Sequence, residues 1–207
     1  MRRLIALALA AGLSTPLPAR AQDASTCEAS VHTLVTTLDT NARRARVWYW
    51  GWMTAGLALL GGQAALAAVT TGNTRKEFIA GAATSLFIPS VLLLQPPVVL
   101  ADAPLLDARV AATTVDGRLG DPCIVLPRAR EILLRDAHDQ AFSTGWFAHA
   151  FVVGGNIAVG LFLGLAFKDW GGAVKQAVGG SVVGEAQILT LPTGALTARG
   201  LGLAGSF

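Results

Sequence analysis

The sequence predicts an all-α membrane protein with four transmembrane helices. The chain of 207 residues is 53% hydrophobic and only 14% charged, whereas soluble domains usually carry about 25% charged residues. Several apolar runs, rich in alanine, leucine and glycine, reach the roughly 20 residues that a membrane-spanning helix needs. These runs lack the alternation of a barrel strand. The final "LGLAGSF" does have evenly spaced apolar residues, so an outer-membrane barrel is the minor alternative.

The first 21 residues have the features of a secretory signal peptide. Arg2 and Arg3 precede an apolar core over 4–13, and Ala19-Arg20-Ala21 matches the small-x-small cleavage rule. We expect cleavage after Ala21, because the apolar core is too short for an uncleaved anchor, which is the alternative. Cleavage removes three of the 16 basic residues and leaves 13, equal to the 13 acidic residues. A neutral mature chain gives no electrostatic support for nucleic-acid binding.

Apolar runs and turn sequences divide the rest of the chain into two tandem helical hairpins. Residues 22–100 form repeat one, with an amphipathic external helix at about 25–46 and spans at about 47–69 and 78–100. Residues 101–196 form repeat two, with an external loop and helix over 101–141 and spans at about 142–167 and 173–196. The turns are "TTGNTRKE" and "KDWGG", and residues 197–207 are a C-terminal tail. The fourth span is the weakest, because it contains Lys175 and Glu185.

The two halves match in order, which suggests an internal duplication. Gly51-Trp52 corresponds to Gly145-Trp146, and Gly61-Gly62-Gln63 corresponds to Gly154-Gly155-Asn156. One cysteine precedes the external helix in each half. Chance agreement among small residues is the alternative. A unit with two spans returns the chain to its starting side, so the two hairpins would be parallel copies.

The signal peptide places the mature N-terminus outside the cytoplasm. We therefore expect both termini and residues 101–141 on the periplasmic side of the bacterial inner membrane, with the outer membrane as the alternative location. The arginines conflict with this topology, because Arg43, Arg44 and Arg46 adjoin the first span on the external side. We follow the signal peptide, which commits the N-terminus first. On that oxidising side, Cys27 and Cys123 are candidates for a disulfide.

Aromatic residues mark the predicted membrane surface. Indole and phenol rings favour the interface between hydrocarbon and headgroups. The residues assigned to this belt are Trp48, Tyr49, Trp50, Trp52 and Trp146. An aromatic cage for a cationic ligand is the alternative, but consecutive side chains point around a helix rather than towards one point.

Polar residues inside the spans are the candidate site residues. Gln63 and Asn156 each need a partner on a neighbouring helix, and Glu185 should face protein or water because an acid in a span is costly. Counting from the turn at 168–172 puts Glu185 at the depth of Asn156, so we expect these two to be in contact. The alternative is that the fourth span is short or irregular and Glu185 is hydrated. His149 lies about seven residues, roughly 10 Å, from Asn156, too far for pairing with Glu185.

Glycines predict where helices approach closely. The pairs Gly61-Gly62 and Gly154-Gly155 are interpreted as packing sites, and so are two spacings of glycine with three residues between. These spacings are Gly160-x-x-x-Gly164 and Gly180-x-x-x-Gly184.

No sequence pattern anchors an enzymatic activity. Neither a Ser-His-Asp order, a phosphate loop nor a zinc motif is present, and Asp136, His138 and Asp139 fit a solvated helix face better than a metal site. We expect no catalytic residue, cofactor or metal. The leading hypothesis is an exported, non-enzymatic integral membrane protein with an assembly or partner-binding role. Its partners would be the lipid bilayer and a second copy or another membrane protein. The alternative is a small oligomeric permease or channel that uses the repeat interface and Glu185, and an intramembrane enzyme is third.

Overall fold

The computed structural model describes residues 24–116 and 118–200, so the predicted signal peptide and the last seven residues lie outside the described residues. The described chain is almost entirely helical. Its elements are, in order, α1 (Ala24–Val69), α2 (Gly72–Ser85), α3 (Phe87–Leu94), α4 (Val99–Thr113), β1 (Thr114–Val115), β2 (Arg118–Leu119), α5 (Pro122–Ser143), α6 (Trp146–Phe167), α7 (Trp170–Leu189) and α8 (Gly194–Gly200). The two short strands pair in an antiparallel manner and join α4 to α5.

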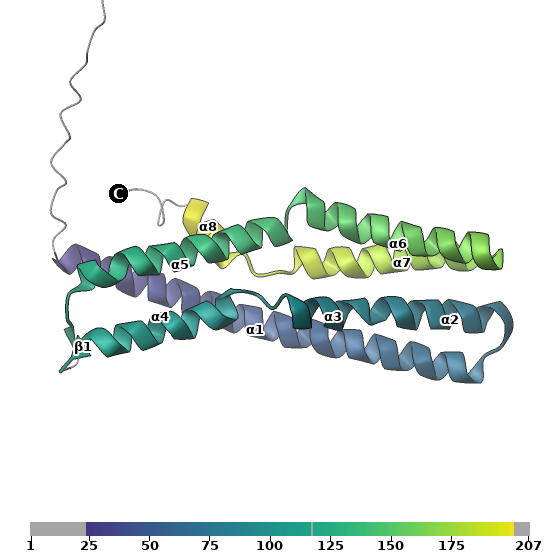
Figure 1. Cartoon of the computed structure of the whole chain (residues 1–207), viewed down its shortest axis with the longest axis horizontal. Coiled ribbons are helices and arrows are strands. Elements are labelled where there is room, and N and C mark those ends of the chain that lie inside the picture. Colours follow the sequence, from purple (N-terminus) through teal and green to yellow (C-terminus); the bar gives the residue numbers. More distant parts are fainter. Residues whose placement is uncertain (1–23, 117, 201–207) are drawn as a thin grey trace, which may run out of the picture.

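The long helices run back and forth along one axis (Figure 1). α1 extends along nearly the whole bundle, and α2, α3 and α4 return beside it. α5 and α6 then run in the direction of α1, and α7 returns beside α6. We call residues 24–46 with α4, α5 and α8 the polar half, and residues 47–69 with α2, α3, α6 and α7 the apolar half.

Three helical segments are long and apolar enough to cross a membrane. They lie within residues 24–69, 72–113 and 122–167. Many large apolar side chains of the apolar half are exposed, among them Leu161 and Leu165. A helix that faces lipid exposes such side chains, whereas a helix that faces water exposes mainly polar ones. The prediction of an all-α membrane protein is confirmed at this level. α7, within the predicted fourth span, is not among the three segments.

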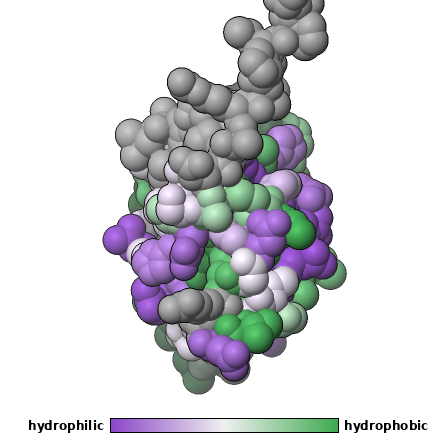
Figure 2. Space-filling view, turned by 90° about the vertical axis from the view of Figure 1, so that its left-hand side faces the viewer, coloured by the Kyte–Doolittle hydropathy of each residue, from purple (hydrophilic) through white to green (hydrophobic). Residues whose placement is uncertain are grey.

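The polar half has a packed core of its own. Figure 2 shows many hydrophilic side chains on its end face. The apolar stripes predicted for the two external helices lie in the core between them. The buried residues are Cys27, Val31, Leu34 and Leu38 of α1, and Ala129, Ile132, Leu133 and Ala137 of α5, and the predicted stripe residue Val35 is partly buried against them. α4 and α8 complete the core with Val99, Ala103, Leu106, Ala195 and Ala198.

The turns are shorter than the sequence predicts, and the first helix is longer. α1 continues without a break from the polar half into the apolar half, because the change in composition near residue 46 includes no proline that would end a helix. Only residues 70–71 separate α1 from α2, and only residues 168–169 separate α6 from α7. Gly72 and Lys168 adopt left-handed φ angles of 64° and 56°, and such a residue lets the chain reverse within a short turn.

The segment 101–141 contains an additional helix where a loop was expected. α3 ends at Leu94, just before Pro96 and Pro97, because proline disfavours a helical conformation in the preceding residue and cannot donate a backbone hydrogen bond. The helix resumes at Val99 as α4. The polar half is consequently built from four helices rather than from two helices and a loop.

Candidate functional site

The helices of the apolar half associate in two pairs. α1 packs against α2 and α3, and α6 packs against α7. In the second pair, a Cβ atom added to Gly160 would lie 2.7 Å from the carbonyl oxygen of Ala173, and one added to Gly164 would lie 2.7 Å from the ring of Trp170. Gly184 makes a similarly close approach to Val152. The close packing predicted from the two glycine spacings is confirmed.

The packing role predicted for the two Gly-Gly pairs is wrong. A Cβ atom added at Gly61, Gly62, Gly154 or Gly155 would meet nothing within 4 Å. All four glycines are exposed. The reason is helical geometry: the residues that contact a neighbouring helix recur every three or four positions, and in each half the following amide, not the glycine pair, faces the partner helix.

Gln63 and Asn156 occupy comparable places in the two helix pairs. Gln63 lies over Gly81 of α2, and its Oε1 accepts a hydrogen bond of 3.3 Å from the Ser85 hydroxyl. Asn156 lies over Gly180 of α7. Its Nδ2 donates to the carbonyl oxygen of Val152 in its own helix, at 2.8 Å.

Glu185 pairs with His149 and not with Asn156. Oε2 of Glu185 lies 2.6 Å from Nδ1 of His149, so both expectations about this carboxylate are wrong. The prediction assumed a turn of five residues, 168–172. In the structure only residues 168 and 169 separate α6 from α7. The shorter turn shifts the register of α7 against α6 and brings Glu185 to the level of His149. Both side chains remain partly exposed, with fractions of 27% and 35%.

A large groove lies between the two helix pairs. Its volume is about 1320 Å³, and its walls are mainly apolar. Gln63 and Asn156 line it, whereas Glu185 does not. One wall comes from α1, α2 and α3, the opposite wall comes from α6 and α7, and residues at the end of α5 line the part next to the polar half.

Polar contacts join the two helix pairs at both ends of the groove. At the end near the turns, Lys175 Nζ lies 3.0 Å from a Glu77 carboxylate oxygen, and Gln176 Nε2 donates to Thr84 Oγ1 at 2.8 Å. At the other end, the indole of Trp52 donates to Thr190 Oγ1 at 3.1 Å. The helix pairs are thus joined by polar contacts at both ends, with the groove in between.

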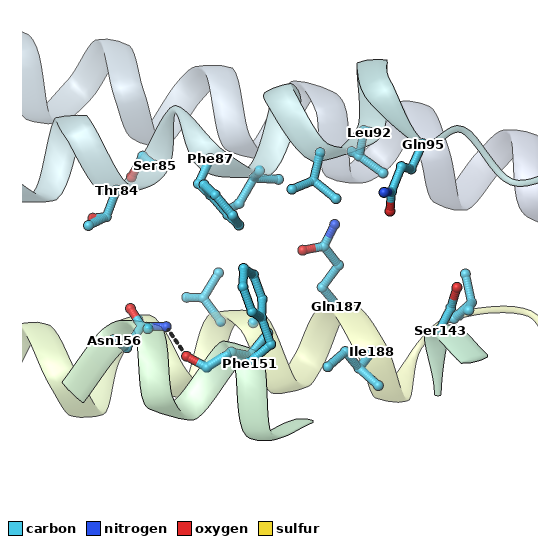
Figure 3. Close-up of a pocket in the computed structure, with 18 of the residues that line it drawn as sticks. Thr84, Ser85, Phe87, Leu92, Gln95, Ser143, Phe151, Asn156, Gln187 and Ile188 are labelled. Atoms are coloured by element: carbon cyan, nitrogen blue, oxygen red, sulfur yellow. Dashed lines mark hydrogen bonds between the residues drawn. The ribbon is translucent and has the colours of Figure 1, made fainter. Parts of the chain in front are cut away.

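Side chains from both helix pairs project into the groove (Figure 3). Phe87 and Phe151 face one another, with ring centroids 5.8 Å apart. Gln95 and Gln187 also project into the space. Neither amide side chain has a hydrogen-bond partner within the described part of the chain.

A buried polar network lies where the groove meets the polar half. Asp136 Oδ2 accepts from Asn41 Nδ2 at 2.8 Å, and Asp136 Oδ1 accepts from Gln140 Nε2 at 3.3 Å. The oxygens of these two amides accept from the backbone N–H groups of Gly194 and Leu196, at 3.2 and 3.0 Å. Burial raises the pKa of Asp136 to about 6. The network ties the start of α8 to α1 and α5.

Two further carboxylates lie near this network. Asp102 is buried and accepts from Arg135 Nε at 2.9 Å. Asp139 lines the groove, and its Oδ2 accepts from the backbone N–H of Val98 at 3.4 Å. Burial raises the pKa of Asp139. The prediction of a solvated helix face is wrong for Asp136, which lies four residues after Ile132 and so belongs to the buried stripe of α5.

The predicted aromatic belt divides into two groups. Trp50 and Trp146 are largely exposed, at 57% and 80%. Trp48 is half-buried, and its indole donates to Thr190 Oγ1 at 3.2 Å. Trp52 makes the same kind of bond, so these two residues join α1 to the end of α7. Tyr49 stacks edge-on against Trp50.

The predicted disulfide is present. Cys27 and Cys123 are bonded, with their Cα atoms 5.2 Å apart, and the bond joins α1 to α5 in the polar half. Among residues 24–116 and 118–200, no group of three or more His, Cys, Asp or Glu side chains could hold a metal ion. Comparisons with protein-family models, with curated protein sequences and with solved structures give no match to this chain.

Proposed function

We propose that this chain is an exported, non-enzymatic integral membrane protein that binds a partner molecule in the groove between its two helix pairs. The observation that carries the proposal is the groove itself, about 1320 Å³ of largely apolar space. That volume exceeds the roughly 300–1,000 Å³ of most small-molecule pockets. Helices in a membrane gain stability by close packing, so a separation that is maintained by contacts at both ends favours an occupant.

The same proposal includes four spans in two parallel hairpins, with α7 as the fourth. α7 packs along the whole of α6, and its 20 residues would cross roughly 30 Å of hydrocarbon. Three of its polar side chains, those of Lys175, Gln176 and Glu185, bond to other helices. The matching positions of Gln63 over Gly81 and of Asn156 over Gly180 support the internal duplication.

An extracytoplasmic polar half in the bacterial inner membrane completes the proposal. Its support is the disulfide between Cys27 and Cys123, because disulfides persist in oxidising compartments. With the polar half outside, both turns near residues 70 and 168 would face the cytoplasm. The predicted signal peptide agrees with this orientation.

Site-specific photocrosslinking tests the binding role. The photoreactive residue p-benzoylphenylalanine would replace Val159, which lines the groove, or Leu161, which is 49% exposed two positions along the same helix and does not line the groove. The full-length protein would be purified in mild detergent and irradiated. We expect a discrete adduct from position 159 only, because purification removes molecules that merely surround the helix. Equal adducts at both positions, or none, would contradict partner binding in the groove.

A small permease or channel is the second candidate. The observation that favours it is the presence of polar side chains at several levels of the groove, namely Thr84, Asn156 and Gln187. A water-soluble thiol reagent would distinguish the two candidates after Gly155→Cys or Gly179→Cys substitution, since both glycines line the groove and a Cβ atom added at either meets nothing within 4 Å. Rapid labelling indicates a water-filled pathway, whereas labelling that is absent from intact membranes indicates a closed binding groove.

A further inference from the structure

The two ends of the groove differ in chemistry. Next to the polar half, it is lined by Gln95, Gln187 and the carboxyl group of Asp139. Farther in, the lining is apolar, with Phe87, Val91, Phe151 and Val159. A groove with a polar mouth and an apolar body matches an amphiphile that inserts its chains between the helix pairs and leaves its head at the mouth.

The amides at the mouth have unused hydrogen-bonding capacity. Gln95 and Gln187 project into the groove (Figure 3), and neither side chain bonds to another described residue. Each amide provides one acceptor oxygen and two N–H donors. A polar group placed beside apolar walls is stabilised when a partner reaches it. Together the two amides can donate to phosphate oxygens and accept from an ammonium group.

The charge at the mouth is acidic. Asp139 uses Oδ2 to accept the 3.4 Å bond from Val98, so its other oxygen is available to a second donor. Asp136 also lines this end, but both of its oxygens already accept hydrogen bonds. The one basic lining residue in the described chain, Lys175, lies at the opposite end beside Glu77. A head group with a cationic N–H donor therefore complements the mouth.

The aromatic pair in the groove favours acyl chains over a helix as the occupant. Phe87 and Phe151 reach towards one another from opposite walls, and their ring centroids are 5.8 Å apart. A helix with its side chains is about 10–12 Å wide, so it would have to force these rings apart. Acyl chains are narrower and flexible, and they can pass beside the rings.

We propose that the groove binds an aminophospholipid of the bilayer, with its primary ammonium group at Asp139 and Gln187 and its acyl chains against Phe87 and Phe151. The phosphate accepts from the side-chain amide of Gln95. This inference rests on the proposed function, because it names the partner of the same groove. The lipid reaches its site laterally from the membrane.

Native mass spectrometry of the full-length protein in detergent tests the lipid and its head group. The protein is incubated separately with phosphatidylethanolamine, phosphatidylcholine and phosphatidylglycerol. Phosphatidylethanolamine has an ammonium group with N–H donors, phosphatidylcholine has a cation without an N–H donor, and phosphatidylglycerol has no cation. We expect a single phosphatidylethanolamine adduct retained about tenfold better than either of the others, which is the scale of one charge-assisted hydrogen bond.

Substitutions at the mouth of the groove test whether its side chains determine the selectivity for the lipid head group. Asp139→Asn removes the charge but keeps an oxygen that can accept from Val98, and it should lower phosphatidylethanolamine retention about tenfold, to the phosphatidylcholine level. Gln187→Leu should weaken retention in the same direction. Val182→Leu is the matched control, because Val182 is 63% exposed on α7 and does not line the groove. This control should bind like the wild type.

The possible results separate this inference from the proposed function. Equal retention of all three lipids, or loss of binding in Val182→Leu as well, would overturn the assignment of an aminophospholipid to the groove. If position 159 crosslinks to a protein or to a molecule without an ammonium group, partner binding stands and the lipid assignment falls. If position 159 gives no adduct and no lipid is retained, both fail.

Discussion

Burial of Asp136 disfavours the charged form of its carboxyl group in the folded protein. Its side chain is 1% exposed, and burial together with the nearby charges of Asp139 and Asp102 raises its pKa to about 6, against the hydrogen bond from Asn41. The ordinary value is 3.8. Because the folded protein holds this proton more tightly than the unfolded chain, the contribution of Asp136 to stability is greatest below pH 4. It falls as the pH rises from about 4 to about 6.

Asp136→Asn should therefore change the pH dependence of stability. Relative to this variant, the wild type is expected to lose stability between pH 4 and pH 6, on the order of 3 kcal/mol for a shift of about two pKa units. Thermal unfolding in detergent across pH 4–8 measures the difference. Asp116→Asn, at an exposed position where asparagine tolerates the positive φ of 49°, is the control. Parallel curves for wild type and Asp136→Asn would contradict the assigned pKa.

At the scale of helices, the α6–α7 interface depends on glycine at particular positions. Gly160→Val would place a branched side chain where even a Cβ atom lies 2.7 Å from the Ala173 carbonyl oxygen. We expect destabilisation of about 1–3 kcal/mol, because an overpacked contact forces the helices apart. Gly154→Val, six residues earlier on the same helix with nothing within 4 Å, is expected to change stability by less than about 0.5 kcal/mol. Thermal unfolding in detergent compares the two, and equal losses would refute a packing role that is specific to Gly160.

Sequence patterns predicted the helices better than their contacts. The buried stripe from Cys27 to Leu38 follows helical periodicity, and its burial was predictable from spacing alone. The register of Glu185 was not, because it depends on whether a turn has two residues or five, and left-handed Lys168 makes the shorter turn feasible. The Asp136 network joins α1, α5 and α8. Contacts between elements so far apart in the sequence leave no local pattern.

At the scale of the whole molecule, the disulfide joins two helices of the polar half that are far apart in the sequence. Cys27 and Cys123 are 96 residues apart, and the bond connects α1 with α5 above the membrane-facing helices. In the chain-entropy model, closing a loop of about 100 residues stabilises the folded state by up to about 4.7 kcal/mol. The Cys27→Ser, Cys123→Ser double variant should unfold at a lower temperature than the wild type, and reductant should lower the midpoint of the wild type only. A reductant effect of the same size on both would show that it acts elsewhere.

The orientation of the bundle in the membrane is the remaining whole-molecule prediction. It needs a test because the arginines before Trp48 predict one orientation and the signal peptide predicts the other. Asn73, Val115 and Lys168 are exposed at the ends of the bundle, so each can be replaced by cysteine while the Cys27–Cys123 disulfide leaves no thiol to react. With the polar half outside, a membrane-impermeant maleimide should label residue 115 in intact spheroplasts, and residues 73 and 168 only after permeabilisation. The opposite pattern would show that Arg43, Arg44 and Arg46 decide the topology. It would also place the polar half and its disulfide in the reducing cytoplasm, where disulfides are rare, so the labelling pattern and the oxidation state of the cysteines should agree.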